Sequence, residues 1–156
     1  MQFMHSRILF LRGKYMSITT SYIYKKESMA LSKQFFFIIR LPIAMSFLGH
    51  GLVRIPKLQA FSNWMVQEME PSGIPSILLI PYSYILPFAE ALLGVLLILG
   101  YKPRYTIAAS IILITTLIFG SSMIENWGAI QAQLVHAICL IFLLWLYEKN
   151  ERYELK

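Results

Sequence analysis

The chain has 156 residues, a formal net charge of +6 and a mean hydropathy of +0.59, and 57% of its residues are hydrophobic. Its polar residues collect between long apolar blocks instead of alternating with apolar ones, which is typical of a membrane protein and argues against a soluble domain. The basic residues stand at the ends of these blocks, as topology signals do, so the charge does not indicate nucleic acid. The single cysteine, Cys139, excludes an intramolecular disulfide and a C-x-x-C redox pair.

Residues 1–33 are mixed in composition, with six Lys and Arg among Ser, Thr, Tyr and Met. This composition predicts a basic, disordered arm on the membrane surface. The alternative is that the native chain starts at Met29, which closely precedes the first apolar block, and that the earlier residues are an over-extended start.

The first apolar block, residues 34–53, is long enough to cross the bilayer core. Pro42 is expected to bend this helix and Pro56 to end it. The connection that follows has apolar residues at three- and four-residue steps: Leu58, Phe61, Met65 and Met69. This spacing predicts a short amphipathic helix in the membrane interface, with Trp64 at headgroup level.

Three further spans are predicted at residues 76–99, 105–124 and 127–147, and a charged tail follows at 148–156. The turns between these spans are very short, so consecutive spans should be antiparallel neighbours. The predicted fold class is therefore all-α: a polytopic membrane protein whose residues 34–147 form a four-transmembrane-helix bundle.

The orientation follows from the distribution of Lys and Arg. With both termini in the cytoplasm, eleven of these residues lie in inside segments, and only Arg54 and Lys57 lie in the outside connection. The positive-inside rule then predicts a multi-pass protein of the inner (plasma) membrane with both ends cytoplasmic.

Ionisable residues lie in or against every span, where a charge is expensive unless it faces a partner or a polar cavity. By helical rise, Arg40 lies about 9 Å and Glu90 about 14 Å from the cytoplasmic ends of their spans. The long arginine side chain can cover this difference, so we expect an Arg40–Glu90 ion pair. Such a pair either serves function or only fixes the register of the helices, and the sequence leaves both open.

A second polar group is predicted nearer the outer side. His50 and Arg54 are four residues apart and share a helix face, and the third span delivers Glu125 to the same level. His136 lies deeper, on a face with Gly128 and Ala132, whose small-x-x-x-small spacing predicts close helix approach. A lone buried histidine is more often a packing residue than a ligand, and two histidines near carboxylates raise the odds of proton handling only modestly. The predicted polar core comprises six residues: Arg40, His50, Arg54, Glu90, Glu125 and His136.

Other site chemistry has little support. The sequence has neither H-x-x-x-H nor E-x-x-H spacing on a span, so no metal site is predicted. The serines lack a nucleophile-elbow context. The aromatic residues flank the spans as interfacial belts do and require no cofactor to explain them.

The order of the short motifs resembles the DoxX family of membrane proteins. The resemblance rests on Phe47-Leu-Gly-His-Gly-Leu-Val-Arg-Ile-Pro56 in the first span and Leu86-Pro-Phe-Ala-Glu-Ala-Leu-Leu-Gly-Val-Leu-Leu-Ile-Leu-Gly100 in the second. Phe119-Gly120, Glu125-Asn126-Trp127 and Gln133-Leu134 also fit. The likeness covers about residues 34–147 in order, with four spans.

This resemblance implies a redox context. The family includes a membrane subunit similar to that of thiosulfate:quinone oxidoreductase, and members associated with oxidative-stress defence. By this resemblance, the polar core consists of Arg40, His50, Arg54 and Glu90. The implied cofactor is a quinone, and the implied partner is a soluble redox or stress-defence protein. The chain departs from the family in its N-terminal arm. Without a separate soluble catalytic domain, it fits a non-catalytic subunit better than an independent enzyme.

Three functions follow, in order of preference. The first is a small membrane subunit that supports redox or oxidative-stress functions through a quinone-accessible polar pocket. The second is a structural or scaffolding membrane protein whose charges only lock the bundle. The third is a small-solute transporter, which would need a dimer or larger assembly because four spans do not enclose a path and no inverted repeat is visible. The lipid bilayer is the common partner, and the oligomeric state is left open.

Overall fold

The computed structural model describes residues 33–154, and the compact unit considered below is Lys33–Glu148. The predicted N-terminal arm, together with the question of a start at Met29, lies outside the described residues. Within these residues the fold is all-α, without strands, as predicted. In chain order, the long helices are α2 (Lys33–Arg54), α3 (Leu58–Glu68), α4 (Ser76–Leu99), α5 (Pro103–Met123) and α6 (Trp127–Glu154).

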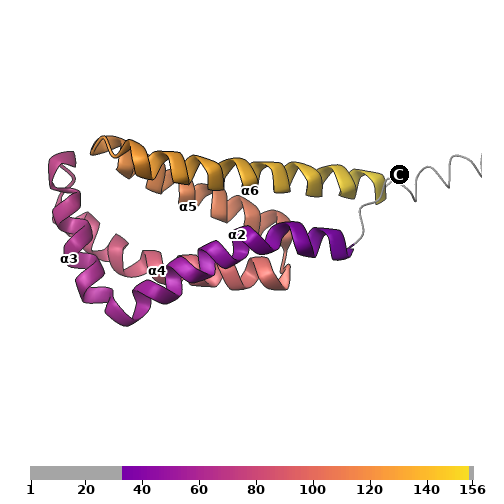
Figure 1. The fold of residues 1–156 in the computed structure, drawn as a ribbon, viewed down its shortest axis with the longest axis horizontal. Helices are drawn as coiled ribbons and strands as arrows, with labels where there is room; N and C mark the ends of the chain where they lie inside the picture. The colour runs from indigo at the N-terminus through magenta and orange to yellow at the C-terminus, as the bar shows by residue number, and fades with distance from the viewer. Residues whose placement is uncertain (1–32, 155–156) are drawn as a thin grey trace, which may run out of the picture. The chain divides into compact units, whose positions relative to one another are not determined.

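Four helical segments are long and apolar enough to cross a membrane. They are α4, α5, α6 and the segment that contains α2, which confirms the predicted four spans. Figure 1 shows these four helices running side by side, with α3 turned across one end of the bundle. The α5–α6 turn lies at the same end as α3, and the α4–α5 turn lies at the opposite end (Figure 1). We call the former the α3 end of the bundle.

The turns end the helices by recognisable backbone signals. Gly100 follows α4 in the left-handed conformation (φ +67°), and its N–H donates to the Leu96 carbonyl over 2.9 Å. A Cβ at this φ would be strained, so glycine suits this position. At the other hairpin, the Asn126 side chain accepts a hydrogen bond from the Ala129 N–H at 3.1 Å and so caps the start of α6.

Helices α2 and α4 make the closest helix–helix contact. A Cβ built on Gly51 would lie 2.5 Å from the Pro87 carbonyl oxygen and the Ala91 nitrogen, and one on Gly94 would lie 2.5 Å from the Leu48 nitrogen. The two glycines therefore let the backbones of antiparallel helices touch. This contact fixes which residues of α2 stand opposite which residues of α4.

Close approach was predicted for α6, at Gly128 and Ala132, and this prediction was wrong for Gly128. The nearest atom to a Cβ built on Gly128 is the Asn126 side-chain oxygen of its own turn, at 3.8 Å, and Ala132 is exposed. The small residues of α6 thus leave space beside the helix instead of drawing a neighbour in.

The predicted amphipathic helix between the first two spans is α3, and its apolar face packs on the bundle. Phe61 and Met65 are buried in one cluster with Leu86 of α4. A buried hydrogen bond of 2.7 Å from the Ser83 hydroxyl to the Ser62 hydroxyl joins the same two helices. The apolar spacing of α3 is therefore used for docking on α4, and its position in the membrane interface stays a prediction.

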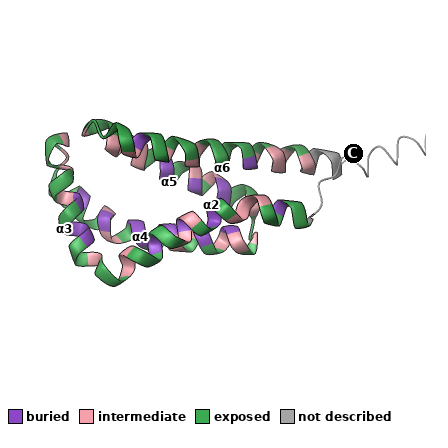
Figure 2. Ribbon diagram, viewed as in Figure 1, coloured by how far each residue is buried: buried purple, intermediate pink, exposed green. Residues whose placement is uncertain are grey.

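The main core lies between α2, α4, α5 and α6. It consists of eight buried residues: Ile43, Ala44, Phe47, Leu97, Ile107, Ile114, Leu140 and Leu143. Outside this core, large apolar side chains are exposed on every long helix, as the green outward faces in Figure 2 indicate. Such a surface is suited to lipid, where exposed apolar groups carry no cost.

Gly51→Ala and Gly94→Ala are each expected to destabilise the bundle by about 1–3 kcal/mol, because a methyl group has no room between the two backbones. The measurement is the unfolding midpoint and free energy of the purified protein in detergent. Gly49→Ala is the matched control, since a Cβ there meets nothing within 4 Å. Equal destabilisation by Gly49→Ala would contradict the assignment of the glycine contact.

Candidate functional site

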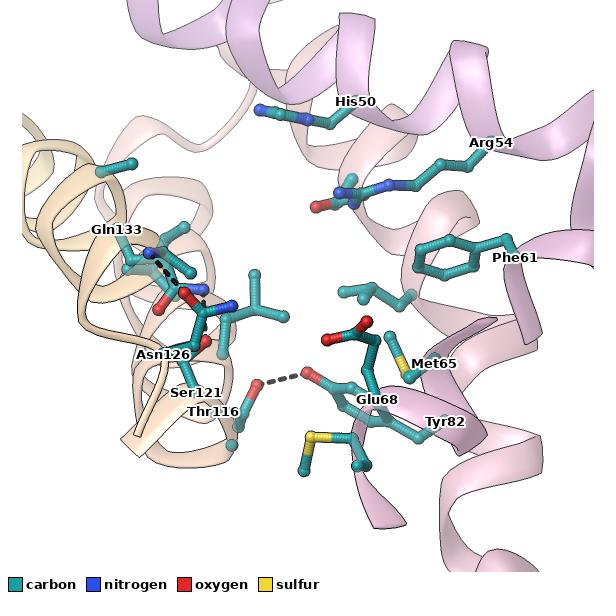
Figure 3. Close-up of a pocket in the computed structure, with 18 of the residues that line it drawn as sticks. His50, Arg54, Phe61, Met65, Glu68, Tyr82, Thr116, Ser121, Asn126 and Gln133 are labelled. Atoms are coloured by element: carbon teal, nitrogen blue, oxygen red, sulfur yellow. Dashed lines mark hydrogen bonds and ion pairs between the residues drawn. The ribbon is translucent and has the colours of Figure 1, made fainter. Parts of the chain in front are cut away.

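A cavity of about 300 Å³ lies at the α3 end of the bundle, between all five helices. Its walls are mostly apolar and aromatic, and several polar side chains point into it from different helices (Figure 3). The volume lies at the lower end of the range typical of small-molecule sites. Four of the six predicted polar-core residues line it: His50, Arg54, Glu90 and His136.

An ion pair between α2 and α4 forms one wall. The Arg54 Nη1 donates to the Glu90 Oε2 at 2.5 Å, and the Glu90 side chain is only 6% exposed, against 26% for Arg54. The Arg54 guanidinium also lies over the Phe61 ring of α3, 4.8 Å from its centroid. Arg54 thus contacts two helices besides its own, and the buried carboxylate has the partner that it requires.

The predicted ion pair between Arg40 and Glu90 was wrong. Arg40 Nη2 donates instead to the Ile98 carbonyl at 3.3 Å, close to Gly100 at the C-terminal end of α4. The prediction assumed that α2 begins at the same depth in the membrane at which α4 ends. In the structure, α2 extends about two turns beyond the C-terminal end of α4. Arg40 therefore meets the carbonyls at that helix end, where a cation is favourable, and Arg54 is left opposite Glu90.

The two histidines, one on α2 and one on α6, lie close together at the cavity. The His136 Nδ1 lies 2.8 Å from the Ala132 carbonyl, and its Nε2 lies 2.7 Å from the Ser46 hydroxyl of α2. A carbonyl only accepts, so Nδ1 carries the hydrogen, and in the neutral imidazole Nε2 accepts from Ser46. The ring centroids of His50 and His136 are 6.2 Å apart. His136 therefore ties α6 to α2.

Glu125 does not line the cavity. It occupies the α5–α6 turn with a left-handed backbone (φ +54°) and an exposed side chain. Its neighbours Ile124 and Asn126 line the cavity in its place. Of the predicted outer group of His50, Arg54 and Glu125, only His50 and Arg54 line the cavity. The α5–α6 turn directs the Glu125 carboxylate away from it.

The cavity is also lined by polar residues that the predicted polar core did not include. The Gln133 amide nitrogen donates to the Ser121 hydroxyl at 2.9 Å, which links α6 to α5. Tyr82 and Thr116 join α4 to α5 through a hydroxyl–hydroxyl contact of 2.8 Å.

Glu68, at the end of α3, also borders the cavity. Glu68 follows Phe61 by seven residues, which places a carboxylate on the apolar face of an amphipathic helix, and that signal was available in the sequence.

The arrangement suits binding of an amphipathic molecule with polar oxygens. Arg54 has donors beyond the one that pairs with Glu90, because a guanidinium carries five N–H groups. Figure 3 shows Arg54 and His50 on one side of the cavity and Gln133, Ser121 and Asn126 on the other. Apolar walls between them would bury a ring or an acyl segment, and the polar groups would orient it.

Comparison with protein-family models found a match to DoxX over residues 35–123. The matched region contains α2, α3, α4 and α5 and includes Arg54, Glu68 and Glu90. Comparisons with curated proteins and with solved structures found no significant match.

A double-mutant cycle tests the ion pair. Arg54→Met is expected to destabilise the protein by about 3–5 kcal/mol, because it leaves the Glu90 carboxylate buried without a partner. Adding Glu90→Leu should recover most of that loss, so the two changes are strongly non-additive. Arg40→Met with Glu90→Leu is the matched cycle and should be additive, since Arg40 contacts Ile98. Unfolding in detergent provides the free energies, and coupling in the Arg40 cycle instead would contradict the assignment.

Proposed function

The chain belongs to the DoxX family, as a multi-pass membrane protein with four apolar helices, and we propose that it is a small membrane subunit that binds a quinone in the cavity at the α3 end. The proposal is based on Arg54, whose guanidinium is held in a fixed orientation at an apolar cavity. Its ion pair with Glu90 holds the guanidinium in place and leaves other donors for a ligand.

A quinone matches this cavity in polarity. Its ring and tail are apolar, and its two carbonyl oxygens only accept hydrogen bonds. A buried acceptor needs a donor, since an unpaired one costs the full desolvation penalty. Arg54 and His50 supply donors at one wall, and the Gln133 amide and Ser121 hydroxyl lie at the other. His50 and Trp64 are exposed at its border, so the cavity is open to its surroundings.

A subunit of this kind would work with a soluble redox or stress-defence protein that exchanges electrons with the bound quinone. Lys102 and Arg104 at the α4–α5 turn favour the cytoplasmic side for that end of the bundle. In the inner membrane, with both termini cytoplasmic, the α3 end and the cavity would then lie at the outer surface. A partner would meet the cavity there.

A scaffolding role is the alternative, and the ion pair itself favours it. Arg54 links α2, α3 and α4 through Glu90 and the Phe61 ring, so its charge has a structural use without any ligand. This role requires no occupant of the cavity. Filling the cavity with a larger side chain therefore separates the two functions.

The purified protein is expected to carry an extractable quinone, and Ala132→Phe is expected to reduce its occupancy at least tenfold. Ala132 borders the cavity without taking part in the ion pair, so a phenyl ring there occupies ligand space. Ala109→Phe, at an exposed position of α5 away from the cavity, is the matched control and should retain quinone. Occupancy is measured by solvent extraction and chromatography after purification in mild detergent. An absence of quinone in all three proteins would support the scaffolding role.

The orientation can be tested with introduced cysteines in a Cys139→Ser background. Gln67→Cys, at the end of α3, is expected to react with a membrane-impermeant maleimide in intact cells, because the α3 end faces outward. Arg104→Cys, at the start of α5, should react only after the inner membrane is permeabilised. Gel-shift of the labelled protein provides the measurement. The reverse pattern would place the cavity on the cytoplasmic side.

A further inference from the structure

The polar groups of the cavity are not all donors, and two of the acceptors among them have no hydrogen-bond partner in the described part of the chain. The carboxylate of Glu68 reaches into the space between α3 and α5 (Figure 3), and no hydrogen bond or ion pair joins it to another side chain in the described part of the chain. The Gln133 Oε1 is buried and likewise has no hydrogen-bond partner among residues 33–154, whereas the nitrogen of the same amide donates to Ser121.

The charge on Glu68 cannot be assigned to the ion pair across the cavity. Arg54 has its carboxylate partner in Glu90, which is far more buried and lies at 2.5 Å. Glu68, which is exposed, is therefore an additional negative group at the rim of the cavity. An ionised carboxylate only accepts hydrogen bonds, so a ligand that forms a hydrogen bond with it must be the donor.

This requirement distinguishes the two redox forms of a quinone. The carbonyl oxygens of the oxidised form only accept, so a carbonyl next to the Glu68 carboxylate would be repelled. The hydroxyl groups of the reduced form, the quinol, both donate and accept. A quinol can therefore accept from Arg54 at one oxygen and donate to Glu68 at the other, with Gln133 Oε1 as a second acceptor.

We propose that Glu68 is the specificity-determining residue of the cavity, which accepts a hydrogen bond from a quinol hydroxyl and makes the cavity prefer the reduced form over the oxidised form. This inference rests on the proposed function and concerns binding alone. A hydrogen bond to a charged group is worth enough to change an affinity by about tenfold or more, so the preference should be of that size.

The test compares a short-tailed benzoquinone with its hydroquinone, held reduced under anaerobic conditions, by titration calorimetry of the full chain in detergent. Empty micelles provide the blank. The wild-type protein is expected to bind the hydroquinone about tenfold more tightly. Glu68→Gln should bring the ratio of the two affinities close to one, since an amide of the same size both donates and accepts.

Glu70→Gln is the matched control, because Glu70 lies two residues further along and is exposed like Glu68 but does not line the cavity. It should retain the wild-type ratio. The unfolding midpoints of both variants should equal that of the wild type, which excludes misfolding as the cause. A ratio near one in the wild type, or an unchanged ratio in Glu68→Gln, would overturn the role of Glu68 and leave quinone binding standing. Failure of the wild type to bind either form would overturn the proposed function as well.

Discussion

The antiparallel contact between α2 and α4 determines most of what this bundle can do. Gly51 meets Pro87 and Ala91, and Gly94 meets Leu48, at distances that leave no room for a side chain. In a bilayer a charged group must find a partner within reach of its own depth, and the register fixed by the glycines decides which partner that is. It places Arg54 beside Glu90 and Arg40 beside the last carbonyls of α4.

The cavity follows from the contrast between this tight contact and the looser position of α6. No backbone of another helix approaches Gly128, and α6 is linked to its neighbours by side chains: His136 to Ser46, and Gln133 to Ser121. Helices held by side-chain bridges stand further apart than helices held at glycines. The same bridges that hold α6 away therefore also supply the polar lining of the space that results.

Hydropathy and turn residues were sufficient to predict the four spans, their hairpins and the amphipathic helix, because these depend on length and local chemistry. His50 and Arg54 could be assigned to one face for the same reason. The partner of Glu90 could not, since it depends on register. With Arg40 opposite Gly100, Glu90 lies ten residues away, or about 15 Å by helical rise, which is beyond an arginine side chain. The glycines of the two facing helices indicate the register, but in the sequence they were interpreted only as parts of the family motifs.

The position of the ion pair bears on whether its charges serve structure or ligand. A pair that only fixed register would be best enclosed on all sides, because any open side lets polar molecules compete for the charges and weakens the attraction. Here Glu90 is enclosed, whereas Arg54 is partly exposed and borders a cavity that also contains an unpaired carboxylate. The buried member of the pair thus holds the exposed member in a fixed orientation. That asymmetry suits the proposed ligand-binding role, because a binding site needs its polar groups held in a fixed orientation.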